Sequence, residues 1–130
     1  MAQDPDGQRI LLVEDSDVAA TLLQYLLMAD GWSVSTCRDG REAQRFIENE
    51  PPVAAALLDI LLPYSSGFHL VQMIRGHATW KDVPIMMLTG NAKRNHMVRA
   101  IELGANDCML KPFQPDEVLT RLKRLVQPAG

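Results

Sequence analysis

Short apolar runs recur along this chain, and an amphipathic segment follows each of them. The runs are Arg9 to Glu14, Trp32 to Cys37, Val53 to Leu58, Val83 to Leu88 and Cys108 to Leu110. Short apolar runs predict strands, and segments with apolar residues at helical spacing predict helices. Strands separated by helices of this length imply right-handed crossovers and a parallel sheet. The pattern therefore predicts an α/β fold.

The apolar character of each run predicts its place in the sheet. The first, third and fourth runs are continuous, which is typical of strands buried on both faces. The run Trp32 to Cys37 alternates with polar residues, as an edge strand does. These features fit a doubly wound, flavodoxin-like sheet of five parallel strands in the order 2-1-3-4-5, with five helices divided between its two faces.

The helices are assigned from their caps and their apolar spacing. Ser16 or Asp17 caps the first helix and Asp30-Gly31 stops it. Its apolar residues at helical spacing are Val18, Leu22, Tyr25, Leu26 and Ala29. The later helices carry Ala43, Phe46 and Ile47; Phe68, Leu70, Val71 and Ile74; Met97, Val98 and Ile101; and Val118, Leu119, Leu122, Leu125 and Val126.

Length and composition bound the class of protein. A chain of 130 residues with 47% hydrophobic and 22% charged residues suits one ordinary globular domain. A formal charge of -3 and the lack of a basic stripe argue against direct nucleic-acid binding. The polar start is unlike a signal peptide, and no apolar run approaches the roughly 18 residues of a membrane span. We expect a cytoplasmic domain over residues 9–126, between a flexible N-terminus (1–8) and a tail or linker stump (127–130).

Acidic residues follow two of the expected central strands. Glu14 and Asp15 come after the first run, and Asp59 comes after the third. In the order 2-1-3-4-5 these strands flank the switch point, where ligands bind outside the carboxyl ends of the strands. Carboxylates that close need a shared proton or a hard cation such as Mg²⁺. The sequence therefore predicts a metal-dependent acidic pocket.

Two more polar residues end strands at the same edge. Thr89 ends the fourth strand and Lys111 ends the fifth. A hydroxyl and an ammonium that face the acids and a metal ion could hold a phosphoryl group. Asp59 could then act as the nucleophile and form an aspartyl phosphate.

A set of motifs occurs in order along nearly the whole chain. They are Leu12-Val13-Glu14-Asp15-Ser16, Leu57-Leu58-Asp59-Ile60-Leu61-Leu62-Pro63 with Gly67, Leu88-Thr89-Gly90, Gly104-Ala105-Asn106-Asp107 and Lys111-Pro112-Phe113. Together they resemble the response regulator receiver domain of two-component signalling, of the chemotaxis-regulator-like kind.

The resemblance implies a metal site and a phosphoacceptor. Asp59 would accept the phosphoryl group. Asp15, Asp59 and the backbone carbonyl of Leu61 would bind Mg²⁺ or Mn²⁺, and Glu14 would hold the ion through water.

It also implies a switch. Thr89, Gly90 and Lys111 would bind the phosphoryl group, and the Lys111-Pro112 peptide bond would be cis. Cys108 stands where the family usually has an aromatic residue, so that part of the switch differs here.

The resemblance further implies partners. A sensor histidine kinase or a histidine phosphotransfer protein would donate the phosphoryl group, and the domain would catalyse only its own phosphorylation and dephosphorylation. The new charge would shift the surface of the last two helices and the last strand, to control an effector protein or an attached output domain. A homodimer through this surface remains open, as does the choice between a stand-alone regulator and part of a longer protein.

Two other classes of protein share features with this chain. A phosphatase of the haloacid dehalogenase type also places a nucleophilic Asp after an apolar strand, but it needs a second acid at the position of Leu61. A flavodoxin-like nucleotide or flavin carrier needs a glycine-rich loop after the first strand, where this chain has Glu14-Asp15-Ser16.

Overall fold

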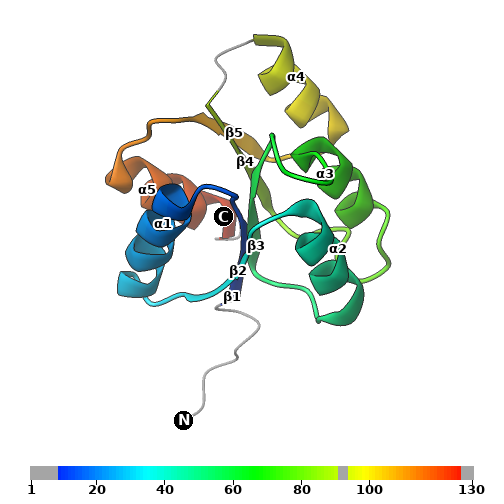
Figure 1. Ribbon diagram of the computed structural model, residues 1–130, viewed down its shortest axis with the longest axis horizontal. Coiled ribbons are helices and arrows are strands. Elements are labelled where there is room, and N and C mark those ends of the chain that lie inside the picture. The colour runs from blue at the N-terminus through cyan, green and yellow to red at the C-terminus, as the bar shows by residue number, and fades with distance from the viewer. Residues whose placement is uncertain (1–8, 91–93, 127–130) are drawn as a thin grey trace.

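A parallel sheet forms the centre of the protein (Figure 1). The computed structural model describes residues 9–90 and 94–126. The strands are β1 (Arg9–Val13), β2 (Ser33–Cys37), β3 (Ala55–Asp59), β4 (Ile85–Thr89) and β5 (Asp107–Leu110). They lie in the order β2-β1-β3-β4-β5, and every pairing is parallel. The predicted α/β fold and strand order are confirmed.

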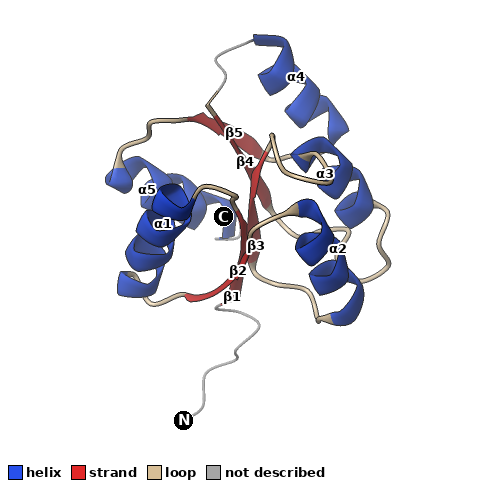
Figure 2. Ribbon diagram, viewed as in Figure 1, coloured by secondary structure: helices blue, strands red, loops and turns tan. Residues whose placement is uncertain are grey.

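Helices cover both faces of the sheet, as Figure 2 shows. They are α1 (Asp17–Ala29), α2 (Gly40–Asn49), α3 (Gly67–Arg75), α4 (Arg94–Leu103) and α5 (Pro115–Val126). Helices α1 and α5 lie on one face, and α2, α3 and α4 lie on the other. No helix within the described ranges is long and apolar enough to cross a membrane. The predictions for residues 1–8 and 127–130 lie outside the described residues.

The register aligns the carboxyl ends of the central strands. Val13 of β1 pairs with Leu58 of β3, and Thr89 of β4 pairs with Leu110 of β5. Because neighbouring strands end at nearly the same level, the residues that follow them meet at one edge of the sheet. We call this the carboxyl edge, and the opposite edge the amino edge.

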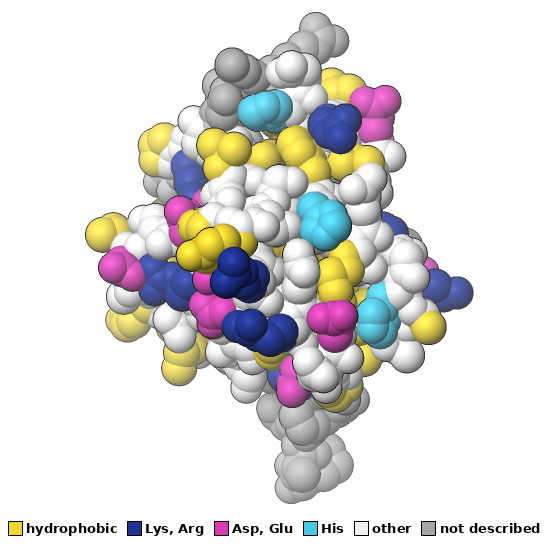
Figure 3. Space-filling view, turned by 45° about the vertical axis from the view of Figure 1, so that its right-hand side comes forward, with side chains coloured by type: hydrophobic (Ala, Val, Ile, Leu, Met, Phe, Trp, Pro, Cys, Tyr) yellow, Lys and Arg dark blue, Asp and Glu magenta, His cyan; other side chains and the backbone are white. Residues whose placement is uncertain are grey.

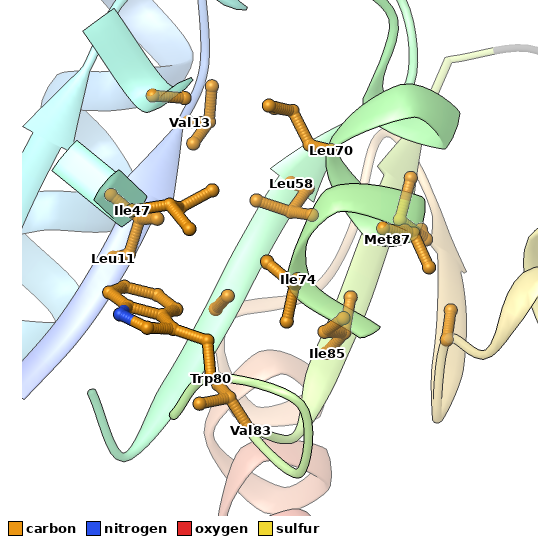
Figure 4. Close-up of a cluster of buried hydrophobic side chains, with 14 of the residues drawn as sticks. Leu11, Val13, Ile47, Leu58, Leu70, Ile74, Trp80, Val83, Ile85 and Met87 are labelled. Atoms are coloured by element: carbon orange, nitrogen blue, oxygen red, sulfur yellow. The ribbon is translucent and has the colours of Figure 1, made fainter. Parts of the chain in front are cut away.

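The core under α2 and α3 is closed by a tryptophan at the amino edge (Figure 4). Trp80 is fully buried, and its ring meets that of Phe46 edge to face at 6.0 Å. Its indole Nε1 donates a hydrogen bond to the carbonyl of Glu50 at 3.0 Å. The one polar atom of the ring is therefore satisfied, which removes the main cost of burying it.

Helix α1 turns a different stripe to the sheet from the one that its spacing suggested. Its buried residues are Ala20, Leu23 and Leu27, whereas Val18 is 80% and Tyr25 72% exposed. Apolar residues occur on nearly every side of this helix, so spacing alone could not identify the buried face. The predicted helix is present, but the residues that it buries are not those named from the spacing.

The remaining helices largely follow the predicted pattern. Ala43 and Ile47 of α2 are buried, as are Val118 and Leu122 of α5. Helix α3 buries Leu70, Val71 and Ile74. Helix α4 is the exception, because its residues Val98 and Ile101 are about half exposed while Ala100 is buried. Both exceptions, on α1 and α4, leave apolar side chains facing solvent.

Candidate functional site

The carboxyl edge gathers the predicted acids around one lysine. Carboxylate oxygens of Glu14, Asp15 and Asp59 lie within 4.8 Å of one another. The ammonium of Lys111 donates to Asp59 Oδ2 at 3.1 Å and also to Glu14 Oε1. Residues that are up to 97 positions apart in the chain thus form one cluster.

Glu14 is fixed by bonds to both of its carboxylate oxygens. Its side chain is fully buried. One oxygen accepts from Lys111, and the other accepts from the backbone N–H of Ser16 at 3.1 Å. Its own backbone N–H donates to the carbonyl of Cys37 at 3.0 Å, which ties the end of β1 to β2. Asp15, the next residue, is exposed and opens the cluster to solvent.

Asp59 lies at the end of β3 with only 6% of its surface exposed. The chain just beyond it is held by two backbone bonds, from Ile60 N–H to the carbonyl of Leu88 at 3.1 Å and from Gly67 N–H to that of Ile60 at 2.8 Å. A β-carbon at Gly67 would overlap the carbonyl oxygen of Asp59. Glycine at this position therefore lets the start of α3 approach the acidic cluster closely.

The other predicted switch residues end the neighbouring strands. Thr89 is 1% exposed at the end of β4, and Gly90 after it is exposed. The backbone N–H of Lys111 donates to the carbonyl of Thr89 at 2.7 Å, so both residues are aligned with each other. The Lys111-Pro112 peptide bond is cis.

Two of the predicted positions carry no polar side chain. Leu61, predicted to act through its backbone carbonyl, is 64% exposed in the loop after Asp59. Cys108 is 6% exposed in β5 and packs in the core on the side of α2, α3 and α4. Burial raises the pKa of its thiol, so the sulfur is a small apolar group here.

Excess negative charge shapes the protonation of the cluster. Burial, and then Glu14, raise the pKa of Asp59 to about 6, although Lys111 opposes this. Burial also acts to raise the pKa of Glu14, but bonds from Lys111, Ser16 and Asp59 outweigh it and lower that pKa. Burial acts to lower the pKa of Lys111, and the two acids raise it. One ammonium thus faces three carboxyl groups without balancing them.

This donor set fits a hard divalent cation. Mg²⁺ prefers carboxylate, carbonyl and water oxygens and keeps several waters, and Mn²⁺ accepts similar ligands. Here the three acids offer oxygens on one side of the cluster, and the exposed Asp15 leaves room for water. A cation would also offset the negative charge of Glu14, which adds to burial in raising the pKa of Asp59. The acidic cluster could therefore bind a metal.

The sequence reasoning missed Arg38, which follows β2 at the carboxyl edge. Its Nε donates to the carbonyl of Glu14 at 2.9 Å, and its Nη2 donates to that of Asp15 at 3.0 Å. The guanidinium also pairs with Asp17. A signal was present, because a cation at the end of a strand adjacent to the first strand must lie near the acids.

A second missed contact lies in the loop after Asp59. Tyr64 has a φ of 69°, and the guanidinium carbon of Arg41 lies 4.0 Å from the centre of its ring. The backbone N–H of Gly40 donates to the carbonyl of Pro63 at 3.0 Å. These contacts join the β3–α3 loop to the start of α2.

Comparison with known proteins gives a consistent family assignment. Residues 10–123 match the family model of the response regulator receiver domain. The chain is 38% identical over 121 residues to the alkaline phosphatase synthesis transcriptional regulatory protein PhoP of Bacillus subtilis. This alignment covers 93% of the chain and 49% of the relative. The chain spans about half the length of the curated relatives it matches.

Solved structures resemble the fold over nearly its full length. A response regulator from Chloroflexus aurantiacus is 35% identical with a TM-score of 0.84, covering 92% of this chain and 97% of that one. The receiver domain of a sensor histidine kinase from Pseudomonas aeruginosa has the same identity and TM-score, covering 92% and 98%. That second structure holds a magnesium ion coordinated in its active-site cleft.

Proposed function

Because this chain belongs to the receiver domain family of two-component response regulators, we propose that residues 9–126 form a phosphoacceptor switch. Asp59 takes a phosphoryl group from a phosphohistidine. The observation that best supports this role is the convergence of Glu14, Asp15, Asp59 and Lys111 at the carboxyl edge. Asp59 ends β3, between Glu14 and Asp15 after β1 and Lys111 after β5, and the exposed Asp15 leaves the cluster open to solvent.

The proposed chemistry is a transfer between two nucleophiles. A carboxylate oxygen of Asp59 attacks phosphorus, and the bond between phosphorus and the donor imidazole breaks. The electron pair stays with the imidazole nitrogen, which takes a proton from water. A metal ion held by Asp15, Asp59 and the Leu61 carbonyl, with Glu14 acting through water, would neutralise the phosphoryl oxygens.

The chain's own residues hold the product. Lys111 already lies 3.1 Å from Asp59 and would pair with a phosphoryl oxygen. The Thr89 hydroxyl would donate to another oxygen, with Gly90 leaving space beside it. On this proposal the domain promotes only its own phosphorylation and dephosphorylation, and it does not act as an enzyme on other molecules.

A protein donor is supported by the exposed stripe on α1. Val18 and Leu22 line a shallow pocket together with Lys111, Pro112 and Phe113, directly beside the acidic cluster. An apolar surface that remains exposed next to a reactive group is typical of a protein contact. We assign this surface to the phosphohistidine donor, a sensor kinase or phosphotransfer protein. Such a donor implies a cytoplasmic location.

The output surface is proposed on α4, β5 and α5. Val98 and Ile101 of α4 and Leu110 of β5 are exposed apolar residues there. Arg121 of α5 pairs with Asp107 of β5 at 3.2 Å, so the surface also has charges that a partner could engage. This surface would contact an effector, an attached output domain or a second copy of the chain.

Direct nucleic-acid binding is not part of the proposal. On the face seen in Figure 3, positive and negative side chains are interspersed. A phosphate backbone is bound by clustered Lys and Arg, and mixed charges give little net attraction.

The decisive test is labelling of the intact protein. Incubation with acetyl phosphate and Mg²⁺ should add one phosphoryl group by mass spectrometry, and Asp59→Asn should not gain it. Asp30→Asn, which changes an exposed acid beyond the far end of α1, should be labelled like the wild type. Full labelling of Asp59→Asn would remove Asp59 from its proposed role.

The donor surface can be tested separately. Replacing Val18 and Leu22 by Ser should slow transfer from a phosphohistidine protein at least tenfold, because the protein contact is lost. Labelling by acetyl phosphate should stay near the wild-type rate, because a small donor needs no docking surface. Equal slowing with both donors would contradict the assignment of α1.

A further inference from the structure

Arg38 holds the backbone that carries the acidic residues. It lies half-buried just after β2, and its guanidinium donates to two consecutive carbonyls of the β1–α1 loop. These carbonyls belong to Glu14 and Asp15, at 2.9 and 3.0 Å. A third donation goes to the carboxylate of Asp17 in the first turn of α1. One side chain therefore binds two carbonyls of the loop and the first turn of the helix that follows it.

The backbone of Arg38 is itself held in place. Its backbone N–H donates to Glu42 Oε1 at 3.1 Å. Asp39, the N-cap of α2, accepts from the backbone N–H of Glu42 at 2.9 Å. The Glu42 carboxylate thus bonds the residue just before the N-cap, while the N-cap side chain bonds the first turn of α2, so the guanidinium extends towards the loop from backbone that is tied to α2.

The loop needs such an anchor more at Asp15 than at Glu14. Glu14 is buried and both of its carboxylate oxygens are bonded. Asp15 is exposed, so packing does little to fix its backbone. The peptide that follows Asp15 is held at both of its polar groups: its carbonyl accepts from Arg38 at 3.0 Å, and its N–H, that of Ser16, donates to Glu14 Oε2 at 3.1 Å. Arg38 therefore acts with Glu14 to set the plane of this peptide, and with it the direction of the Asp15 side chain.

We propose that Arg38 is a positioning residue for the metal ligands, because its two bonds to the Glu14 and Asp15 carbonyls aim the Asp15 carboxylate into the cluster. This inference rests on the proposed metal-dependent phosphorylation. Groups that orient metal ligands change affinity by roughly 10- to 100-fold when removed. Arg38 acts through the backbone and need not touch the ion.

Charge alone predicts the opposite effect. Arg38 is a cation near a cation site, so its removal would strengthen Mg²⁺ binding if only electrostatics mattered. The direction in which Mg²⁺ affinity changes when Arg38 is replaced therefore distinguishes positioning from electrostatics. Lysine at position 38 keeps the charge but lacks the planar fork that reaches two carbonyls at once.

The experiment compares Arg38→Gln and Arg38→Lys with the wild-type protein. The Mg²⁺ dissociation constant is measured by isothermal titration calorimetry, and the acetyl phosphate labelling rate is measured as a function of Mg²⁺ concentration. Both variants should raise the dissociation constant and the half-saturating Mg²⁺ concentration roughly tenfold. The labelling rate at saturating Mg²⁺ should stay within about twofold, because the ligands themselves are intact.

Two controls separate positioning from general damage. Arg45→Lys changes an exposed arginine on α2 and should leave Mg²⁺ binding unchanged. Asp17→Asn removes the ion pair but keeps both carbonyl bonds, and it should change the dissociation constant by less than about twofold. If Arg38→Gln does not fold, Arg38→Lys alone decides the question.

The outcomes are distinct. Unchanged or tighter Mg²⁺ binding in Arg38→Gln, or wild-type binding in Arg38→Lys, would overturn the role of Arg38 while leaving the proposed function intact. A wild-type protein that neither binds Mg²⁺ nor becomes labelled would overturn both.

Discussion

The two edges of the sheet use arginine in different ways. At the amino edge, the Arg75 guanidinium donates to the carbonyls of Gly104, Lys81 and Val83 at 2.7–2.9 Å and to Asn106 Oδ1 at 2.9 Å. All four of these acceptors are uncharged oxygens. At the carboxyl edge, Arg38 bonds carbonyls beside three acids that one lysine does not balance. At the amino edge the Arg75 guanidinium has hydrogen-bond acceptors around it, whereas at the carboxyl edge the acidic cluster keeps an excess of negative charge.

The difference indicates where stability and reactivity are located. Burial lowers the pKa of the Arg75 guanidinium, although Asp82 opposes this, so its carbonyl bonds compensate a partly desolvated charge. Asn106 also accepts from the backbone N–H of Ile85 at 2.8 Å, which extends the network into β4. We expect changes at the amino edge to affect folding first, and changes at the carboxyl edge to affect metal binding and phosphorylation first.

The largest expected effect is loss of the amino-edge network. Arg75→Ala should lower the free energy of unfolding by about 3 kcal/mol, because it leaves two partly buried carbonyls, those of Gly104 and Val83, without this donor. Urea denaturation followed by circular dichroism measures this. Arg45→Ala should change it by less than about 0.5 kcal/mol. A loss at Arg75 no larger than that control would end the contrast between the two edges.

The next largest effect is expected at the acidic cluster, where a substitution should raise the free energy of unfolding instead of lowering it. The folded-state pKa of Asp59 is about 6, above its ordinary 3.8. The folded state therefore keeps a proton that the unfolded chain loses between about pH 4 and 6, and stability falls as pH rises through this window. The cost at neutral pH is at most about 3 kcal/mol.

Asp59→Asn should accordingly stabilise the metal-free protein by about 2 kcal/mol at pH 7.5, somewhat less than that limit because the bond to Lys111 weakens. The gain should vanish below pH 4. Urea denaturation in EDTA at several pH values measures it. Destabilisation at pH 7.5 would show that Asp59 and Lys111 form a favourable pair rather than part of a charge excess.

A smaller effect is expected at the exposed acid. Asp15→Asn should weaken Mg²⁺ binding about tenfold, or roughly 1.4 kcal/mol, because one anionic ligand is lost. Its stability without metal should stay near the wild-type value, because Asp15 is exposed. Calorimetric titration and thermal unfolding in EDTA give the two quantities. Unchanged Mg²⁺ affinity would exclude Asp15 from the ligand set.

The smallest effect is at the loop beyond Asp59. Tyr64 has a φ of 69°, a strained conformation that asparagine adopts more easily. Tyr64→Asn relieves that strain but loses the ring contact with Arg41, worth about 0.5–1 kcal/mol. We expect the free energy of unfolding to change by less than about 1 kcal/mol. A larger loss that Arg41→Ala reproduces would show that the ring contact dominates.

The sequence predicted the features that topology determines. Once the order of the strands follows from their apolar runs, Glu14, Asp59, Thr89 and Lys111 must share an edge. The roles of these residues in phosphorylation stay predictions until the labelling experiments are done. Strand boundaries were less accurate, since the third strand begins at Ala55 instead of Val53.

Features that depend on side-chain packing could not be predicted. Leucines occur on several sides of α1, so no pattern showed that Leu23 is buried and Leu22 is half exposed. The strand order places Arg38 near the acids, but its bonds depend on how closely the turn after β2 approaches the loop after β1, and the sequence gives no distance between them. The network of Arg75 joins α3 to the turn before β5 and is equally invisible in the sequence.

The position of Trp80 has a practical consequence. In a parallel sheet, Trp32 before β2 and Trp80 before β4 both lie at the amino edge, a full strand length from Asp59. Indole emission is therefore expected to report loss of the native state and to stay constant as Mg²⁺ is added. Indole emission can then be used to follow conformational stability, while calorimetric titration follows Mg²⁺ occupancy, without interference between the two signals.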